Sequence, residues 1–215
     1  ANLGLWDFLS LLADDYQVSE WLNFRAVLLA ERMKEFRDAV REASGPDKVF
    51  GSDVWPPSIA FLGGHIYSEW EKGSDYLTGG SSAGGVVGWA TTVTNLATEW
   101  ATFLCESIDG LDEKDALRLI FRMFGFEDLE LPDSVEGIRG GQLPIVEIYE
   151  REVRKLKAVA SGNVPLYPPI SVSGEPESVR RLCTVIVENE CDGALFGVNP
   201  DSDELLEVVR EVFKV

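Results

Sequence analysis

Apolar residues recur three and four positions apart along most of this chain, the spacing that places them on one face of a helix. The first such stretch runs from Leu22 to Val40, with charged residues between the apolar ones, and it ends near Ser44-Gly45-Pro46. The same pattern predicts further helices at about 58–70, 86–106, 116–123, 144–156, 179–186 and 205–212.

Short apolar runs lie between these helices and predict four β-strands, at 48–55, 75–78, 164–167 and 192–198. Pro56-Pro57 follows the first run and ends that strand, because proline has no N–H to donate to a sheet. Strands that alternate with helices predict a parallel sheet with right-handed crossovers.

Four strand-helix units predict an α/β fold that is half of a (β/α)8 TIM barrel. A complete barrel takes about 250 residues, and this chain has 215. We therefore expect one domain over residues 1–215 that holds strands five to eight, with the opening helix as the one after strand four. Residues 1–20 are interpreted as an N-terminal extension or a remnant of the preceding unit. The start at Ala1 indicates processing or a portion of a longer protein.

The charge of the chain narrows the partners to be expected. Its formal net charge is −18, while 26% of its residues are charged and 45% are hydrophobic. We expect no binding to nucleic acid or to an anionic membrane, because a protein that binds phosphates needs clustered Lys and Arg to displace counterions. A neutral or cationic partner fits this charge better.

The cysteines and the N-terminus bear on the compartment. Cys105, Cys183 and Cys191 show neither a CxxC motif nor a Cys/His spacing, so neither a disulfide framework nor a zinc site is expected. No apolar run approaches the roughly 20 residues of a spanning helix, and the chain lacks a signal peptide's basic start and apolar centre. The sequence therefore predicts a cytoplasmic protein with no cofactor, no metal and no membrane contact.

Several short motifs along the chain occur in an order that is similar to that of one family. They are Trp21-Leu22-Asn23-Phe24-Arg25, Gly51-Ser52-Asp53-Val54-Trp55-Pro56-Pro57-Ser58, Leu62 with Gly64, Leu143-Pro144 with Glu147 and Glu150, Val164-Pro165-Leu166-Tyr167-Pro168, and Asp192-Gly193-Ala194-Leu195-Phe196. From about Trp21 to the end, the chain resembles the C-terminal half of the TIM-barrel glycoside-hydrolase-like proteins of bacteria and archaea.

This resemblance implies a barrel that acts on carbohydrates with carboxylates at the C-terminal ends of its strands. The chain departs from the family's pattern in two places. An aromatic-rich segment often follows strand six, whereas this chain has Thr78 and the Gly/Ser segment 79–85. A further acid commonly comes from the end of strand four, and that strand is not in this sequence.

Asp53 is the candidate catalytic residue. Glycoside hydrolysis uses two carboxyl groups, about 5 to 5.5 Å apart for retention of configuration and about 6.5 to 9.5 Å apart for inversion. Asp53 lies where a barrel strand should end, and the Pro-Pro turn after it would fix its direction. The alternative is that Asp53 caps a loop or pairs with a polar group of a neighbouring strand. The sequence does not identify the second carboxylate.

The candidate substrate-binding residues are Trp55, Tyr167, Asn199 and Asp201. The ring of Trp55 is suited to stack on the apolar C–H face of a sugar, or else to pack under a loop. Tyr167, Asn199 and Asp201 lie at the ends of the last two strands and would line the same mouth. Alternatively, Asn199-Pro200-Asp201 forms the turn into the last helix, with Asp201 or Ser202 as its cap.

Other features favour structure over chemistry. Segment 79–85 lacks the Gly-x-x-x-x-Gly-Lys-Ser/Thr pattern of a phosphate-binding loop and has no nearby Lys or Arg. His65, the one histidine, has no Ser, Cys or metal-ligand pattern around it, and we expect it to be a solvated or packed helix residue. The acidic runs 109–115 and 127–136 lack EF-hand spacing and are predicted to be solvated surface.

The sequence as a whole predicts a carbohydrate-active barrel protein, a glycoside hydrolase if another half supplies the missing strands and acid. The alternative is a non-catalytic half-barrel that self-associates or binds a sugar, or a truncated fragment without activity. Open sheet edges and an exposed apolar interior would need a partner. That partner is expected to be the missing N-terminal half or a second copy in a homodimer.

Overall fold

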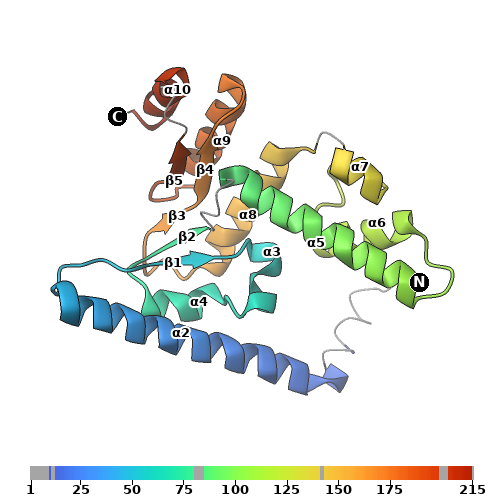
Figure 1. The fold of residues 1–215 in the computed structure, drawn as a ribbon, viewed down its shortest axis with the longest axis horizontal. Coiled ribbons are helices and arrows are strands. Elements are labelled where there is room, and N and C mark those ends of the chain that lie inside the picture. The colour runs from blue at the N-terminus through green and yellow to red at the C-terminus, as the bar shows by residue number, and fades with distance from the viewer. Residues whose placement is uncertain (1–9, 11–12, 80–84, 141–142, 199–202, 215) are drawn as a thin grey trace.

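The computed structural model describes residues 10, 13–79, 85–140, 143–198 and 203–214 (Figure 1), and 65% of the structure is helical. The longer helices are α2 (Tyr16–Ser44), α5 (Gly85–Ser107), α6 (Glu113–Met123), α8 (Ile145–Val159), α9 (Pro176–Glu188) and α10 (Asp203–Phe213). The shorter ones are α3 (Pro57–Ala60), η1 (Phe61–Gly63), α4 (Tyr67–Trp70), η2 (Glu71–Gly73) and α7 (Val135–Gly140). In the described part of the chain, none of these helices combines the length and the apolarity needed to cross a membrane.

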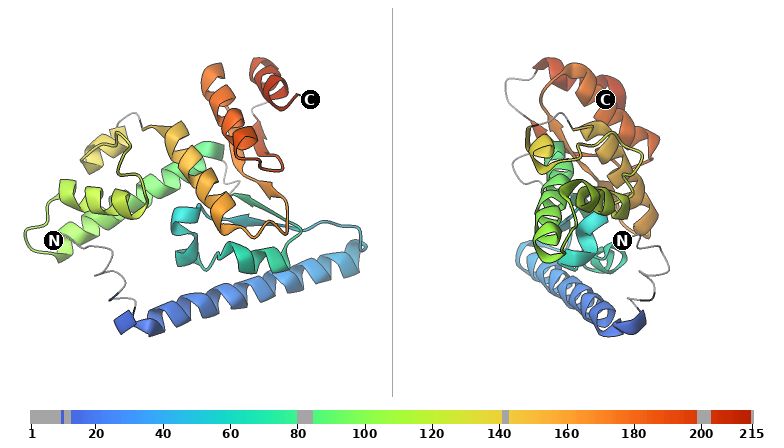
Figure 2. Two further views of the ribbon diagram at one scale, coloured as in Figure 1. Left: turned by 180° about the vertical axis from the view of Figure 1, so that it is seen from behind. Right: turned by 90° about the vertical axis from the view of Figure 1, so that its right-hand side faces the viewer.

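The strands of the described residues form two small parallel sheets. Strands β1 (Gly51–Val54), β2 (Tyr76–Gly79) and β3 (Leu166–Tyr167) pair in that order, and β4 (Pro169–Val172) pairs with β5 (Leu195–Val198). Figures 1 and 2 show α2 along one side of the molecule and α9 with α10 at the opposite side. The two sheets lie between them.

The predicted half-barrel is wrong. The four predicted strand regions are confirmed, and so is parallel pairing, but the strands are two to four residues long and the sheet is split. The split falls at Pro168, which lies between β3 and β4 and has no N–H to continue a ladder. In addition, α5, α6, α7 and α8 all lie between β2 and β3, so a helical layer replaces the single crossover helix of a barrel unit.

The helical stripes predicted from the sequence are confirmed best near the C-terminus. Val179, Leu182, Cys183 and Ile186 of α9 are all buried. The α6 stripe is turned from its predicted position, since Leu117 and Phe121 are buried while Met123 is 60% exposed. The helix predicted over 58–70 is broken into α3, η1 and α4, and the chain turns at Gly64, whose φ is +78°.

Buried apolar residues of the described chain gather in two hydrophobic cores. The first lies between the sheets and α2, α4, α8, α9 and α10, and the second lies between α3, α5, α6, α7 and α8. Helix α8 serves both, because Ile148 belongs to the second core and Tyr149 and Val153 to the first. The same is true of α3, in which Ile59 and the next residue Ala60 face different cores.

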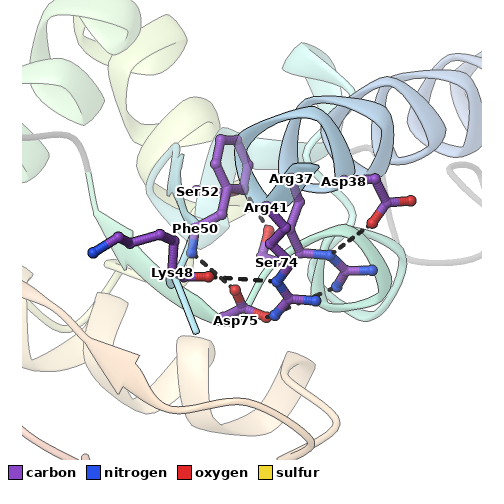
Figure 3. A network of polar contacts seen from close by, with 8 residues as sticks. All are labelled: Arg37, Asp38, Arg41, Lys48, Phe50, Ser52, Ser74 and Asp75. Carbon is purple, nitrogen blue, oxygen red and sulfur yellow. Dashed lines mark hydrogen bonds and ion pairs between the residues drawn. The ribbon is translucent and has the colours of Figure 1, made fainter. Parts of the chain in front are cut away.

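The carboxylate of Asp75 fastens α2 to the start of the first sheet (Figure 3). It accepts a hydrogen bond from Arg41 Nη2 at 2.6 Å and another from the backbone N–H of Phe50 at 2.8 Å. Arg37 Nη1 lies 4.0 Å from the same carboxylate. The side chain of Asp75 is only 18% exposed, so these cations and donors replace the water that it has lost.

We predict that Asp75→Ala lowers the free energy of unfolding by about 3 kcal/mol, because it leaves Arg37 and Arg41 without their shared carboxylate in a partly buried place. Urea denaturation followed by circular dichroism measures this change. The matched control is Glu35→Ala, which removes the exposed partner of Arg32 and should change the free energy of unfolding by no more than about 0.5 kcal/mol. Equal effects of the two substitutions would contradict this account.

Candidate functional site

Three side chains line up across the first sheet where its strands end. Asp53 of β1 is in register with Thr78 of β2, and Thr78 is in register with Tyr167 of β3. Residues in register on parallel strands point to the same face, and strands lie about 4.8 Å apart, so Asp53 and Tyr167 are about 10 Å apart at their Cα atoms. We call Asp53, Thr78 and Tyr167 the strand-end row.

The strand-end row faces away from the hydrophobic core. The residues just before it on each strand point to the other face and are buried: Ser52, Leu77 and Leu166. Within the row, Asp53 is exposed, and Thr78 and Tyr167 are half-buried. The row therefore lies on the face of the sheet opposite these buried residues, and its backbone is held by the core beneath.

The ring of Tyr167, in the row, and the ring of Tyr76, beside it, are held in place by glycines. A Cβ atom at Gly51 would lie 2.0 Å from ring atoms of Tyr76, so the ring lies over the bare backbone of β1. The rings of Tyr76 and Tyr167 meet edge to face with centroids 5.5 Å apart, and Gly193 lies against the other side of Tyr167. Thr78 Oγ1 donates a 2.8 Å hydrogen bond to the carbonyl of Tyr167. These contacts hold both rings in one orientation.

Trp55 follows β1 and is 45% exposed. Its backbone N–H donates a 3.0 Å hydrogen bond to His65 Nδ1, and its carbonyl accepts a 2.5 Å hydrogen bond from the hydroxyl of Tyr67. The rings of Trp55 and His65 are tilted with centroids 5.7 Å apart, and Gly63 lies close to the indole. The indole ring of Trp55, which was predicted to stack on a sugar, is therefore partly exposed, and the backbone that carries it is held by hydrogen bonds.

His65 is neutral in this arrangement. It lies between η1 and α4, not inside a helix as the sequence predicted. Burial, together with the nearby positive charge of Arg25, lowers the pKa of His65 from 6.5 to about 4. Neutral imidazole keeps Nδ1 free of a proton and able to accept the Trp55 N–H. Arg25 also stacks over Trp21 at 4.4 Å, next to the Trp55 platform.

A buried polar cluster lies behind this face. The carboxylate of Glu152, which is fully buried, accepts hydrogen bonds from the backbone N–H and the hydroxyl of Ser58 and from Lys155 Nζ at 2.9 Å. Lys155 Nζ also donates to Ser58 Oγ at 2.6 Å and to the carbonyl of Phe124. It lies 4.4 Å from the ring centre of Phe126. We call Ser58, Glu152 and Lys155 the junction cluster.

The junction cluster has the composition of a serine nucleophile site, but its geometry is that of a structural ion pair. A lysine that activates serine must lose its proton. Lys155 instead donates hydrogen bonds to the carboxylate of Glu152 and the carbonyl of Phe124 and lies over the ring of Phe126, which are the contacts of a structural ion pair. The Ser58 hydroxyl is occupied on both sides, by Glu152 and by Lys155.

Two acids at this end of the sheet, Asp53 and Glu152, both influence the hydroxyl of Tyr67. Burial raises the pKa of the Tyr67 hydroxyl well above its usual 10, and the negative charges of Glu152 and Asp53 raise it further. The charges of both acids therefore act on the same hydroxyl. Only Asp53 is exposed, since Glu152 is enclosed and paired with Lys155.

The structure brings some of the predicted site residues together. Asp53 and Tyr167 lie in the same row, and Trp55 lies just beyond β1, but Asn199 and Asp201 are outside the described residues. Reasoning from sequence missed Tyr76, Thr78 and the junction cluster. Tyr76 and Thr78 alternate about Leu77, and this alternation was the signal that could have identified them. The junction cluster gave no such signal, because Ser58 is too distant from Glu152 in the sequence.

Other reactive groups do not join this site. Among the residues the structure describes, no group of three or more His, Cys, Asp or Glu side chains is placed to hold a metal ion. Burial raises the pKa of Cys183 and of Cys191 to about 11, so both thiols stay protonated at neutral pH.

Comparisons of the chain with family models, with curated proteins and with solved structures each returned no match. The function must therefore be argued from the geometry of the site.

We predict that His65 makes stability fall as the pH falls from about 6.5 to about 4. Because its pKa is about 4 in the folded protein and 6.5 in an unfolded chain, the unfolded state binds more protons in this window. His65→Asn should keep an acceptor for the Trp55 N–H and remove this titration. Urea unfolding of both proteins from pH 7 to pH 4.5 should show the wild type losing stability faster; parallel curves would contradict the prediction.

Proposed function

We propose that this protein binds a neutral carbohydrate on the strand-end row. The observation that carries the proposal is the register of Asp53, Thr78 and Tyr167 across three strands, with the ring of Tyr76 against that of Tyr167. A sugar offers hydroxyl groups and an apolar C–H face. The row offers a carboxylate, a hydroxyl and aromatic rings within about 10 Å, a span that fits one or two sugar rings.

Each element of the row has a role in such binding. The carboxylate of Asp53 accepts hydrogen bonds from sugar hydroxyls, and hydrogen bonds to a charged acceptor are the stronger ones. Tyr167 and Tyr76 supply rings whose orientation is already fixed, so little side-chain entropy is lost on binding. Trp55 adds a second platform at the edge of the row. With a net charge of −18, the protein favours a neutral sugar over an anionic one.

The site supports binding better than hydrolysis. Hydrolysis of a glycoside by the usual mechanism requires two carboxyl groups that reach the scissile bond from either side. Asp53 is exposed at this face, while Glu152, the other acid near Tyr67, is enclosed and neutralised by Lys155. A protein that only binds a sugar needs the exposed carboxylate of Asp53 and no second acid.

Isothermal titration calorimetry with neutral oligosaccharides of glucose, xylose and mannose, and with oligogalacturonate as the anionic comparison, tests the proposal. We expect saturable binding of at least one neutral series and none of oligogalacturonate. Asp53→Asn and Tyr167→Ala should each weaken binding about tenfold or more, through loss of charged hydrogen bonds and of a stacking ring.

The matched control is Phe103→Ala on α5, which removes an aromatic side chain that is 65% exposed but far from the row in sequence. It should leave affinity unchanged. Thermal melting of each variant separates lost binding from lost folding. Failure of every neutral oligosaccharide to bind, or equal affinity of Tyr167→Ala and wild type, would contradict the proposal.

Reducing ends measured in the same mixtures distinguish binding from hydrolysis. We expect their concentration to stay constant over a day. Release of reducing ends that disappears in Asp53→Asn would show a glycoside hydrolase instead, and would require a second carboxylate that the described face does not offer.

A further inference from the structure

A second candidate site lies away from the strand-end row, between α6 and the segment that follows it. A cavity of about 600 Å³ is present there, within the range of small-molecule sites. Its floor is formed by Leu117, Phe121 and Phe126, which are nearly fully buried members of the second core. Apolar residues of the following segment also line the cavity: Leu129, Leu131 and Pro132.

The cavity also has cationic side chains along one side. Lys114, Arg118 and Arg122 are four residues apart on α6, so they lie on one face of the helix. Lys114 pairs with Asp133 at 2.6 Å, and Arg118 pairs with Asp115 at 2.9 Å. In the described part of the structure, the side chain of Arg122 makes no hydrogen bond or ion pair, and its backbone carbonyl accepts one from the N–H of Gly125. One guanidinium at the edge of the cavity is thus available.

We propose that this cavity binds an amphiphile with a single negative charge, such as an alkyl or aryl carboxylate. The apolar body would lie on the phenylalanine and leucine floor, where its transfer from water is favourable. The carboxylate would pair with Arg122, whose planar guanidinium matches it in a bidentate contact.

The surrounding acids define the charge of this ligand. Glu127 and Asp133 also line the cavity, so a second negative charge on the ligand would be repelled. A neutral amphiphile of the same length would fill the floor but leave Arg122 without a partner. The cavity therefore distinguishes a monoanion from both a dianion and an uncharged molecule.

Calorimetric titration of the full chain with octanoate, 1-octanol and octyl phosphate tests this proposal. We expect octanoate to bind one molecule per chain and to bind more tightly than the other two. Arg122→Gln should weaken octanoate about tenfold, the loss expected for one charged pair, and leave 1-octanol unchanged. Arg122 is exposed, so this variant should fold as the wild type does.

Two further variants complete the test. Leu129→Trp should fill the cavity and abolish the binding of octanoate, whereas Arg32→Gln, which removes an exposed arginine of α2, should leave it unchanged. The proposal is overturned if octanoate does not bind, if 1-octanol or octyl phosphate binds as tightly, or if Arg122→Gln binds octanoate as the wild type does. None of these outcomes bears on the strand-end row.

Discussion

The carboxylate of Glu152 determines how the two hydrophobic cores of this protein meet. A buried charge is costly unless it is paired and hydrogen-bonded, and here the N–H and hydroxyl of Ser58 and the ammonium group of Lys155 meet that need. These partners come from two elements, α3 and α8, whose neighbouring residues face different cores. Lys155 extends the connection to the carbonyl of Phe124, just after α6. The junction cluster therefore links the sheet, the long helices and α6.

The candidate binding face depends on this link. Ser58 lies five residues after Asp53 and is the second residue of α3, the short helix that follows Trp55, so holding Ser58 fixes the direction in which β1 ends. The hydroxyl of Tyr67 donates a hydrogen bond to the carbonyl of Trp55, and His65 accepts a hydrogen bond from the N–H of Trp55. The opposite end of β1 is held by Asp75 through Phe50. A strand of four residues is thus anchored at both ends, which is why a face made of such short strands can present a fixed row of side chains.

Local features of this fold could be predicted from sequence, and its long-range arrangement could not. The apolar stripe of α9 and the four strand regions depend on the spacing of apolar residues, which can be read directly from the sequence. The half-barrel failed because Pro168 divides the sheet between β3 and β4, and because the helices between β2 and β3 form a core of their own. Asp53 and Tyr167 were predicted from their places at strand ends to lie on one face, and they lie in one row. Glu152 gave no signal, because its role depends on Ser58, 94 residues earlier.

Hydrogen–deuterium exchange of Glu152→Gln, compared with wild type, tests most directly whether the junction cluster joins the two cores. Glutamine keeps the shape of the side chain but loses the charge that holds Lys155 and places amide donors beside those of Ser58. The account predicts that amide protons exchange at least about tenfold faster in both residues 51–58 and residues 120–126, while α10 is unchanged. Faster exchange in only one of these segments, or in neither, would contradict it.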